Sequence, residues 1–201
     1  MVNLFDADNS GFHSTLFGQF TIDKRDNIFL TNSGLYLNTK LSFLVNKGDF
    51  SNVIPIYLLK LNSVIPLKDN LLLLANFHHR TIFNTNEISS AYSNYASNSL
   101  NSYSDYSFPV LGQRGISFLE PVSTLGELGV RINIDDGNYI TPRIQALLQF
   151  DEWSNFGFDR LNWSAGLTYQ RATRLGPIDF TLGYQNEFSE FNFFGGVGYQ
   201  F

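Results

Sequence analysis

The stretch that decides the fold is residues 139–151, YITPRIQALLQFD. Its apolar residues recur at every second position, which is the period of side chains on one face of a β-strand. Polar residues such as Arg143 and Gln145 occupy the positions between them. The stretch therefore predicts a strand with one apolar face and one polar face.

The same alternation continues through most of the chain, and turn sequences separate the alternating segments. In residues 34–46, for example, Leu35 and Leu37 share one face while Tyr36 and Asn38 share the other. No segment requires a helix, so we expect an all-β protein with antiparallel strands. Nine strands are predicted, at residues 15–24, 34–46, 53–65, 70–80, 124–134, 139–151, 161–172, 177–185 and 190–201.

Strand length separates a membrane barrel from a soluble sandwich, because both show this alternation. The predicted strands run to roughly 10–13 residues, long enough to cross a bilayer at a tilt, whereas strands in soluble proteins usually have about five or six. Aromatic residues gather toward strand ends, as in the belts at bilayer interfaces. We therefore predict an antiparallel transmembrane β-barrel in the bacterial outer membrane, in contact with lipid. The belt residues are Tyr36, Trp153, Tyr169, Tyr184, Tyr199 and Phe201.

Composition excludes several other classes of function. A net charge of -5 and a pI near 5.0 leave no basic footprint for nucleic acid. The chain has no cysteine, and His78 and His79 adjoin on a predicted strand, so their side chains point to opposite faces and do not chelate one metal. No Gly-x-Ser-x-Gly motif occurs, and the Asp136–Gly137 pair is typical of a hairpin turn. We expect neither an enzyme nor a bound cofactor or metal.

One long loop, residues 81–123, interrupts the pattern. Its first part is rich in Ser, Asn and Tyr and has too little apolar sequence to form a core of its own. Residues 108–121, FPVLGQRGISFLEP, instead gather apolar residues and glycines around Arg114. A solvated loop has little use for these residues, so we expect the segment to fold back into the barrel lumen as a plug.

Several motifs together suggest a family. Residues 20–43 read as a strand, a turn with Asp-Arg and Gly, and a second strand, while residues 163–184 read as a closing hairpin with Leu-Gly-Pro at its turn. Residues 113–116, QRGI, take the place of a Val-Arg-Gly-aromatic loop motif, and residues 193–201, FFGGVGYQF, read as a final strand. From about residue 14 to 201 the chain resembles the C-terminal part of the outer-membrane insertase and two-partner-secretion transporter superfamily, the BamA-like barrels.

The resemblance implies a role for the loop arginine. Gln113, Arg114 and Gly115 would form the plug-loop motif, and the arginine would contact an acidic Phe-x-Asp-x-Gly strand motif. Asp151 takes the Asp position of that motif, although Gln and Trp replace its Phe and Gly. Since a buried guanidinium needs a partner, we expect Asp151 to hold Arg114, with Glu127 as the reserve partner. A solvated Arg114 is the alternative.

The final strand would carry a signal that the barrel-assembly machinery reads during insertion. Its residues are Gly196, Gly198, Tyr199 and Phe201. Glycines weaken strand pairing and packing, which suits a seam that has to part. Relief of crowding in a tight barrel wall explains them equally well.

The family's barrel has sixteen strands, whereas nine are predicted here, or eight if residues 15–24 lie outside the membrane. The chain is therefore expected to be part of a sixteen-strand barrel or half of a barrel closed by a homodimer. Unpaired strand edges in lipid are not tolerated.

By this resemblance the protein would insert or export polypeptides across the outer membrane, with a polypeptide cargo or an attached passenger domain as its partner. Residues 126–150 also look like the barrels attached to patatin-like phospholipases, so a membrane anchor and translocator for such an enzyme is an alternative. A small passive pore or ligand-binding barrel is a further alternative.

Overall fold

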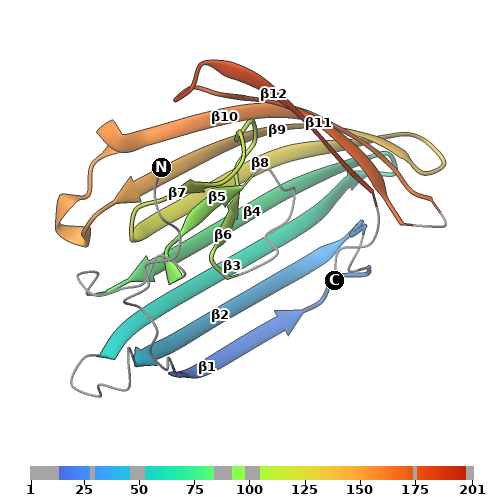
Figure 1. Ribbon diagram of the computed structural model, residues 1–201. Coiled ribbons are helices and arrows are strands. Elements are labelled where there is room, and N and C mark those ends of the chain that lie inside the picture. The colour runs from blue at the N-terminus through green and yellow to red at the C-terminus, as the bar shows by residue number, and fades with distance from the viewer. Residues whose placement is uncertain are drawn as a thin grey trace.

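The computed structural model describes residues 14–27, 30–45, 53–83, 92–97, 105–173 and 176–197. Nine of its strands form one antiparallel sheet in the order β1-β2-β3-β4-β8-β9-β10-β11-β12 (Figure 1). All nine expected strands are confirmed, each within a few residues of its expected bounds. They are β1 (Ser14–Asp23), β2 (Gly34–Val45), β3 (Val53–Lys68), β4 (Leu71–Ile82), β8 (Val122–Asp135), β9 (Asn138–Phe150), β10 (Leu161–Arg171), β11 (Ile178–Gln185) and β12 (Glu190–Val197).

Short turns join β3 to β4, β8 to β9 and β11 to β12, and glycines shape several of the connections between strands. Gly137 adopts a φ of +86° between β8 and β9, so the Asp136–Gly137 pair forms the expected hairpin turn. Between β1 and β2, Gly34 has a φ of +120°, and a Cβ atom there would lie 2.2 Å from the Lys24 carbonyl oxygen. This position accepts only glycine, which explains the glycine of the turn motif.

Two short 3₁₀ helices, η3 (Trp153–Asn155) and η4 (Phe158–Arg160), lie in the connection between β9 and β10. No helix in the described part of the chain is long and apolar enough to cross a membrane.

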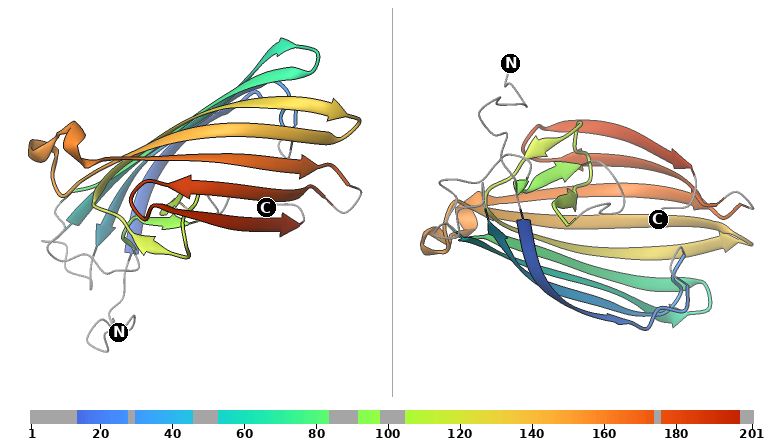
Figure 2. Two further views of the ribbon diagram at one scale, coloured as in Figure 1. Left: turned by 90° about the horizontal axis from the view of Figure 1, so that it is seen from above. Right: turned by 60° about the horizontal axis from the view of Figure 1, so that its bottom comes forward.

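The sheet curves into a trough (Figure 2). Residues that pair across strands share a face, so the register assigns every side chain to the convex or the concave side. Leu41 pairs with Tyr57, Phe77 with Gly126 and Ala146 with Trp163, and all of these point to the convex side. The concave side carries most of the polar residues of the alternating pattern.

The long loop adds a second, smaller sheet that the sequence did not predict. Strands β5 (Tyr95–Ser97), β6 (Ser107–Pro109) and β7 (Ser117–Phe118) pair in the order β6-β5-β7. Both views in Figure 2 show these strands inside the trough, on its concave side.

The two outer strands of the large sheet have free edges within the described residues. β1 pairs only with β2, and β12 pairs only with β11. The structure therefore shows an open nine-stranded sheet, and closure into a barrel would require both of these edges to be paired.

Candidate functional site

The candidate site is the contact between the loop segment and the concave face of the sheet. Phe108 and Val110 of the loop are almost fully buried with Leu125 of β8 and Leu147 of β9. Ala96 of β5 completes this cluster. Because Phe108 and Val110 are buried here, this part of the segment lies against the sheet, whereas Ile116 and Phe118 beyond the loop tip are 73% and 54% exposed.

Two lysines of the sheet hold the loop through Asp105. The Lys40 Nζ atom of β2 lies 2.9 Å from Asp105 Oδ2, and the Lys60 Nζ atom of β3 lies 3.6 Å from Asp105 Oδ1. Burial raises the pKa of Asp105, but the hydrogen bond from Lys40 and the charges of both lysines outweigh it, so this pKa lies below its usual value. Asp105 is therefore a carboxylate at neutral pH.

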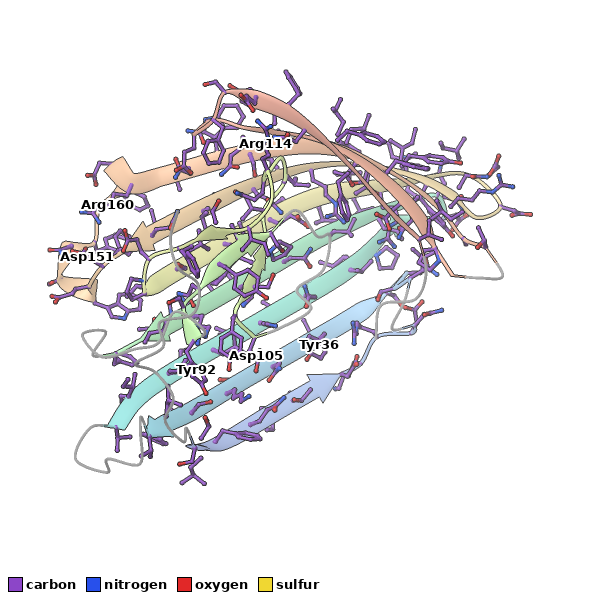
Figure 3. All side chains as sticks on the ribbon, in the orientation of Figure 1. Tyr36, Tyr92, Asp105, Arg114, Asp151 and Arg160 are labelled. Carbon is purple, nitrogen blue, oxygen red and sulfur yellow. The ribbon has the colours of Figure 1, made fainter. Side chains whose placement is uncertain are left out.

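Arg80 of β4 is the third cation on this side of the trough. Its guanidinium donates hydrogen bonds to the Asn94 side-chain oxygen and, at 2.9 Å, to the Tyr92 carbonyl oxygen. It also lies 4.6 Å from the centre of the Tyr106 ring, a cation–π contact. Arg80 is 1% exposed, so its charge is buried, and these three contacts all come from the loop. Figure 3 shows Tyr92 and Asp105 of the loop above strands β2–β4.

The two adjacent histidines point to opposite faces, as the sequence indicates. His78 stacks on Phe108 of the loop, with ring centres 4.1 Å apart. His79 lies on the convex side, where it hydrogen-bonds Thr81 and Thr124 and packs against Trp153. Neither histidine belongs to a cluster of three metal-ligating side chains, and no such cluster occurs among the described residues.

The other half of the loop contact uses backbone atoms. The Gln145 side chain of β9 donates to the Pro109 carbonyl oxygen at 2.9 Å and accepts from the Leu111 N–H at 2.8 Å. Asn192 of β12 donates to the Gly112 carbonyl oxygen at 2.7 Å. The edge strand β12 is thus tied directly to the loop.

Glycine permits this close approach. A Cβ atom built on Gly183 of β11 would lie 2.3 Å from the Gly112 nitrogen. Gly112 itself has a φ of +75°, and a Cβ atom there would lie 2.9 Å from the Tyr184 carbonyl carbon. Side chains at either position would push the loop away from the sheet.

A polar network lies beneath the loop. Glu127 of β8 accepts hydrogen bonds from Asn76 and Gln145, each at 2.6 Å, and its carboxylate lies 3.4 Å from the Arg143 guanidinium. Gln145 thereby joins the buried Glu127 carboxylate to the loop backbone. The Glu127 carboxylate already has three partners on the neighbouring strands β4 and β9, so it does not serve as a reserve partner for Arg114.

The expected pair between Arg114 and Asp151 does not form, and this prediction is corrected. The Arg114 side chain is 79% exposed, and its guanidinium lies 3.9 Å from Glu190 at the start of β12. Asp151 follows the end of β9, outside the concave face, where Arg160 lies 3.3 Å from it. A hydrogen bond from Asn155 lowers the pKa of Asp151. Figure 3 shows Asp151 and Arg160 together, away from Arg114.

The neighbours of Arg114 are placed differently. Gln113 is buried and donates a hydrogen bond to the Ser117 hydroxyl at 2.6 Å. Gly115 has a φ of +79° and turns the chain toward β7. The motif therefore forms a turn at the tip of the loop, with the glutamine inside and the arginine in solvent.

Of the predicted residues in the final strand, only Gly196 is described, while Gly198, Tyr199 and Phe201 lie outside the described residues. A Cβ atom on Gly196 would lie 3.1 Å from the Asp179 carboxylate of β11. This contact favours relief of crowding as the reason for this glycine.

Tyr36, which the sequence placed in an aromatic belt, faces the concave side. This orientation follows from the register of β1 and β2. The Arg25 guanidinium lies 4.6 Å from the centre of the Tyr36 ring. The structure thus removes Tyr36 from the residues that could line a belt on the convex face.

The sequence missed most of the residues that hold the loop. In the sequence they are only polar or glycine positions of alternating strands, and their partners lie far away along the chain. The missed residues are Lys40, Lys60, Arg80, Gln145, Gly183 and Asn192.

Two comparisons with known proteins give no match for this chain. No protein-family model matches the sequence. A comparison with curated proteins gives no match either.

Proposed function

We propose that the chain forms part of the wall of an outer-membrane β-barrel of the insertase and translocator superfamily, which inserts or exports polypeptides. The observation that carries the proposal is the contrast between the two faces of the sheet. One face is mostly apolar, while the other carries most of the polar residues and holds a folded loop. This is the pattern of a wall with lipid on one side and a lumen on the other.

The convex face supports contact with lipid. Apart from Lys68, Asp135 and Arg171 at strand ends, the convex positions of the nine strands assigned by the register carry no Asp, Glu, Lys or Arg. Many large apolar side chains there are solvent-exposed, including Leu128 and Ile144 at 56% each. Apolar patches of this extent mark a surface that meets another apolar phase.

The docked loop favours the interpretation of the concave side as a gated lumen rather than as a permanently open pore. It covers the concave face through the Asp105 contacts on one side and the Gly112 contacts on the other. A translocator has to displace such a segment when polypeptide passes. The contact from Asn192 to Gly112 would transmit that displacement to the edge strand β12.

The direction of the strands favours a larger barrel rather than a barrel closed by a homodimer. All eight neighbouring pairs in the sheet are antiparallel, so β1 and β12 run in the same direction. If two copies stood in the same orientation, β1 of one would meet β12 of the other as parallel strands. An odd number of further strands would allow an antiparallel seam, and the sixteen strands implied by the resemblance require seven more.

Assisted folding of a client barrel tests the proposal. The protein is reconstituted into phosphatidylcholine vesicles, and a urea-unfolded eight-stranded outer-membrane barrel is added. We expect the client to fold faster than in vesicles that hold an equal amount of a passive pore. Folding at the same rate in both vesicle preparations would contradict the insertase proposal, and failure of the protein to enter vesicles would contradict membrane insertion itself.

A further inference from the structure

A groove on the convex face has no role in the proposed function. It has a volume of about 460 Å³ and crosses strands β3, β4, β8, β9 and β10. Its smallest lining residues include Ala75, Gly126 and Ala146, which lie on three neighbouring strands. A Cβ atom on Gly126 would have no atom within 4 Å, so the groove is open above this glycine.

Larger apolar side chains border these small residues. Phe77, Leu128, Ile144 and Trp163 line the groove and are between 36% and 56% exposed. Trp163 is braced by Tyr184, with ring centres 5.5 Å apart. The groove is therefore a recess between large side chains in an apolar face.

Apart from Ser63 of β3, which lies on the convex side, the polar residues of the neighbouring strands that line the groove have their side chains committed elsewhere. Asn76, Glu127 and Gln145 hydrogen-bond one another on the concave side. A charged ligand would find only the neutral Ser63 hydroxyl and the Trp163 N–H as side-chain partners in the groove, so most of its desolvation would be uncompensated. The chemistry of the groove suits a flexible hydrocarbon chain, which is recognised by shape alone.

We propose that this groove seats an acyl chain of a membrane lipid. The proposal rests on the proposed function, because the convex face has to meet lipid for an acyl chain to reach it. It also goes beyond that function, since a seated chain would exchange more slowly than the other lipids around the wall. The occupant would lie across β4, β8 and β9 and contact the Trp163 ring.

Tryptophan fluorescence offers a direct readout. The chain has two tryptophans, and Trp153→Phe leaves Trp163 as the single reporter while keeping a ring against His79. The variant is reconstituted into phosphatidylcholine vesicles in which a rising fraction of lipid carries bromine on its acyl chains. Bromine quenches indole fluorescence only on contact. Because both lipids compete for one seated position, we expect quenching to rise in proportion to the brominated fraction, whereas contact with several exchanging bulk lipids would reach its limit at a lower fraction.

Two glycines of the convex face provide a matched pair of variants. Gly126→Leu fills the groove, whereas Gly18→Leu adds the same side chain at another open convex position, on β1. Displacing one or two methylene groups should weaken the preference for the groove roughly four- to fifteenfold in Gly126→Leu and leave it unchanged in Gly18→Leu. Ala146→Leu fills the groove from β9 and serves if Gly126→Leu does not fold.

The outcomes separate the two proposals. Quenching that follows the bulk curve in the parent, or that is equal in the parent and the groove-filled variants, would overturn the acyl-chain site while leaving lipid contact intact. An absence of any quenching by brominated lipid would overturn both the site and the membrane location.

Discussion

The loop contacts the two sides of the trough by different physical means. On β2, β3 and β4 it meets three cations, Lys40, Lys60 and Arg80, which Asp105 and neighbouring polar groups of the loop partner. On β9 to β12 it is held by close backbone packing at Gly112, with hydrogen bonds from long polar side chains. The first contact depends on charge and therefore on pH, while the second depends on volume. A change of conditions can loosen the charged side without altering the packed side.

Breaking the packed side should have the largest effect. Gly183→Val places atoms where the Gly112 backbone now lies, and we expect a loss of about 3 kcal/mol in the free energy of unfolding, as for severe overpacking. Urea unfolding measures the loss, and chymotrypsin cleavage between residues 105 and 118 reports the release of the loop. Gly126→Ala is the control, because its new Cβ atom meets open space. Equal stability of the two variants would show that the loop does not pack on β11 as described.

On the charged side, the most buried cation should matter most. In Arg80→Met, the Asn94 side chain and the Tyr92 carbonyl lose a charged donor, with an expected cost of about 2 kcal/mol. The same urea and protease measurements apply. Arg160→Met removes an exposed ion pair with Asp151 and should cost about 0.5 kcal/mol or less. A cost for Arg80→Met as small as for Arg160→Met would argue against a charged contact between loop and sheet.

Acid should loosen the charged side alone. The pKa of Asp105 lies below its usual value of 3.8 when the loop is docked, so its contribution is complete above that pH and is lost as the pH falls through the lowered pKa. We expect the fluorescence of a label attached to the loop to report loosening below pH 3.8. Asp105→Asn should be looser at neutral pH and lack this acid transition. An identical transition in both proteins would assign it to another group.

The smallest effect is expected at the tip of the loop. Arg114→Ala removes an exposed guanidinium 3.9 Å from Glu190, so we expect a change of about 0.5 kcal/mol or less. The yield of folded protein after heating on a gel measures it. Loss of the folded form would instead support the buried arginine that the family resemblance implies.

The strands could be predicted because their signal is local. Alternation at a period of two identifies a strand from a few consecutive residues, as in residues 139–151, and the Asp136–Gly137 turn is equally local. The partners of the loop carry no such signal. Lys40 and Asp105 are 65 residues apart, and Asn192 and Gly112 are 80 apart. Nothing in the spacing of either pair marks them as neighbours.

The wrong prediction for Arg114 has a specific cause. The resemblance supplied a partner by motif position, but β9 ends at Phe150, so Asp151 falls in the connection to β10 and Arg160 reaches it from the same connection. Glu127 faces the concave side as expected, but Arg143, Gln145 and Asn76 are closer in the sheet. Local geometry at a strand end decided the pairing.

The amino-acid sequence by itself determined the strands, their turns and the division into an apolar and a polar face, because these follow from the period of side chains along a single strand. Only the tertiary structure decided what covers the polar face. The loop could dock only once Lys40, Lys60 and Arg80 had been brought side by side, and Gly112 could approach Gly183 only across the curved sheet. Those contacts depend on strand register and curvature, which are properties of the assembled sheet.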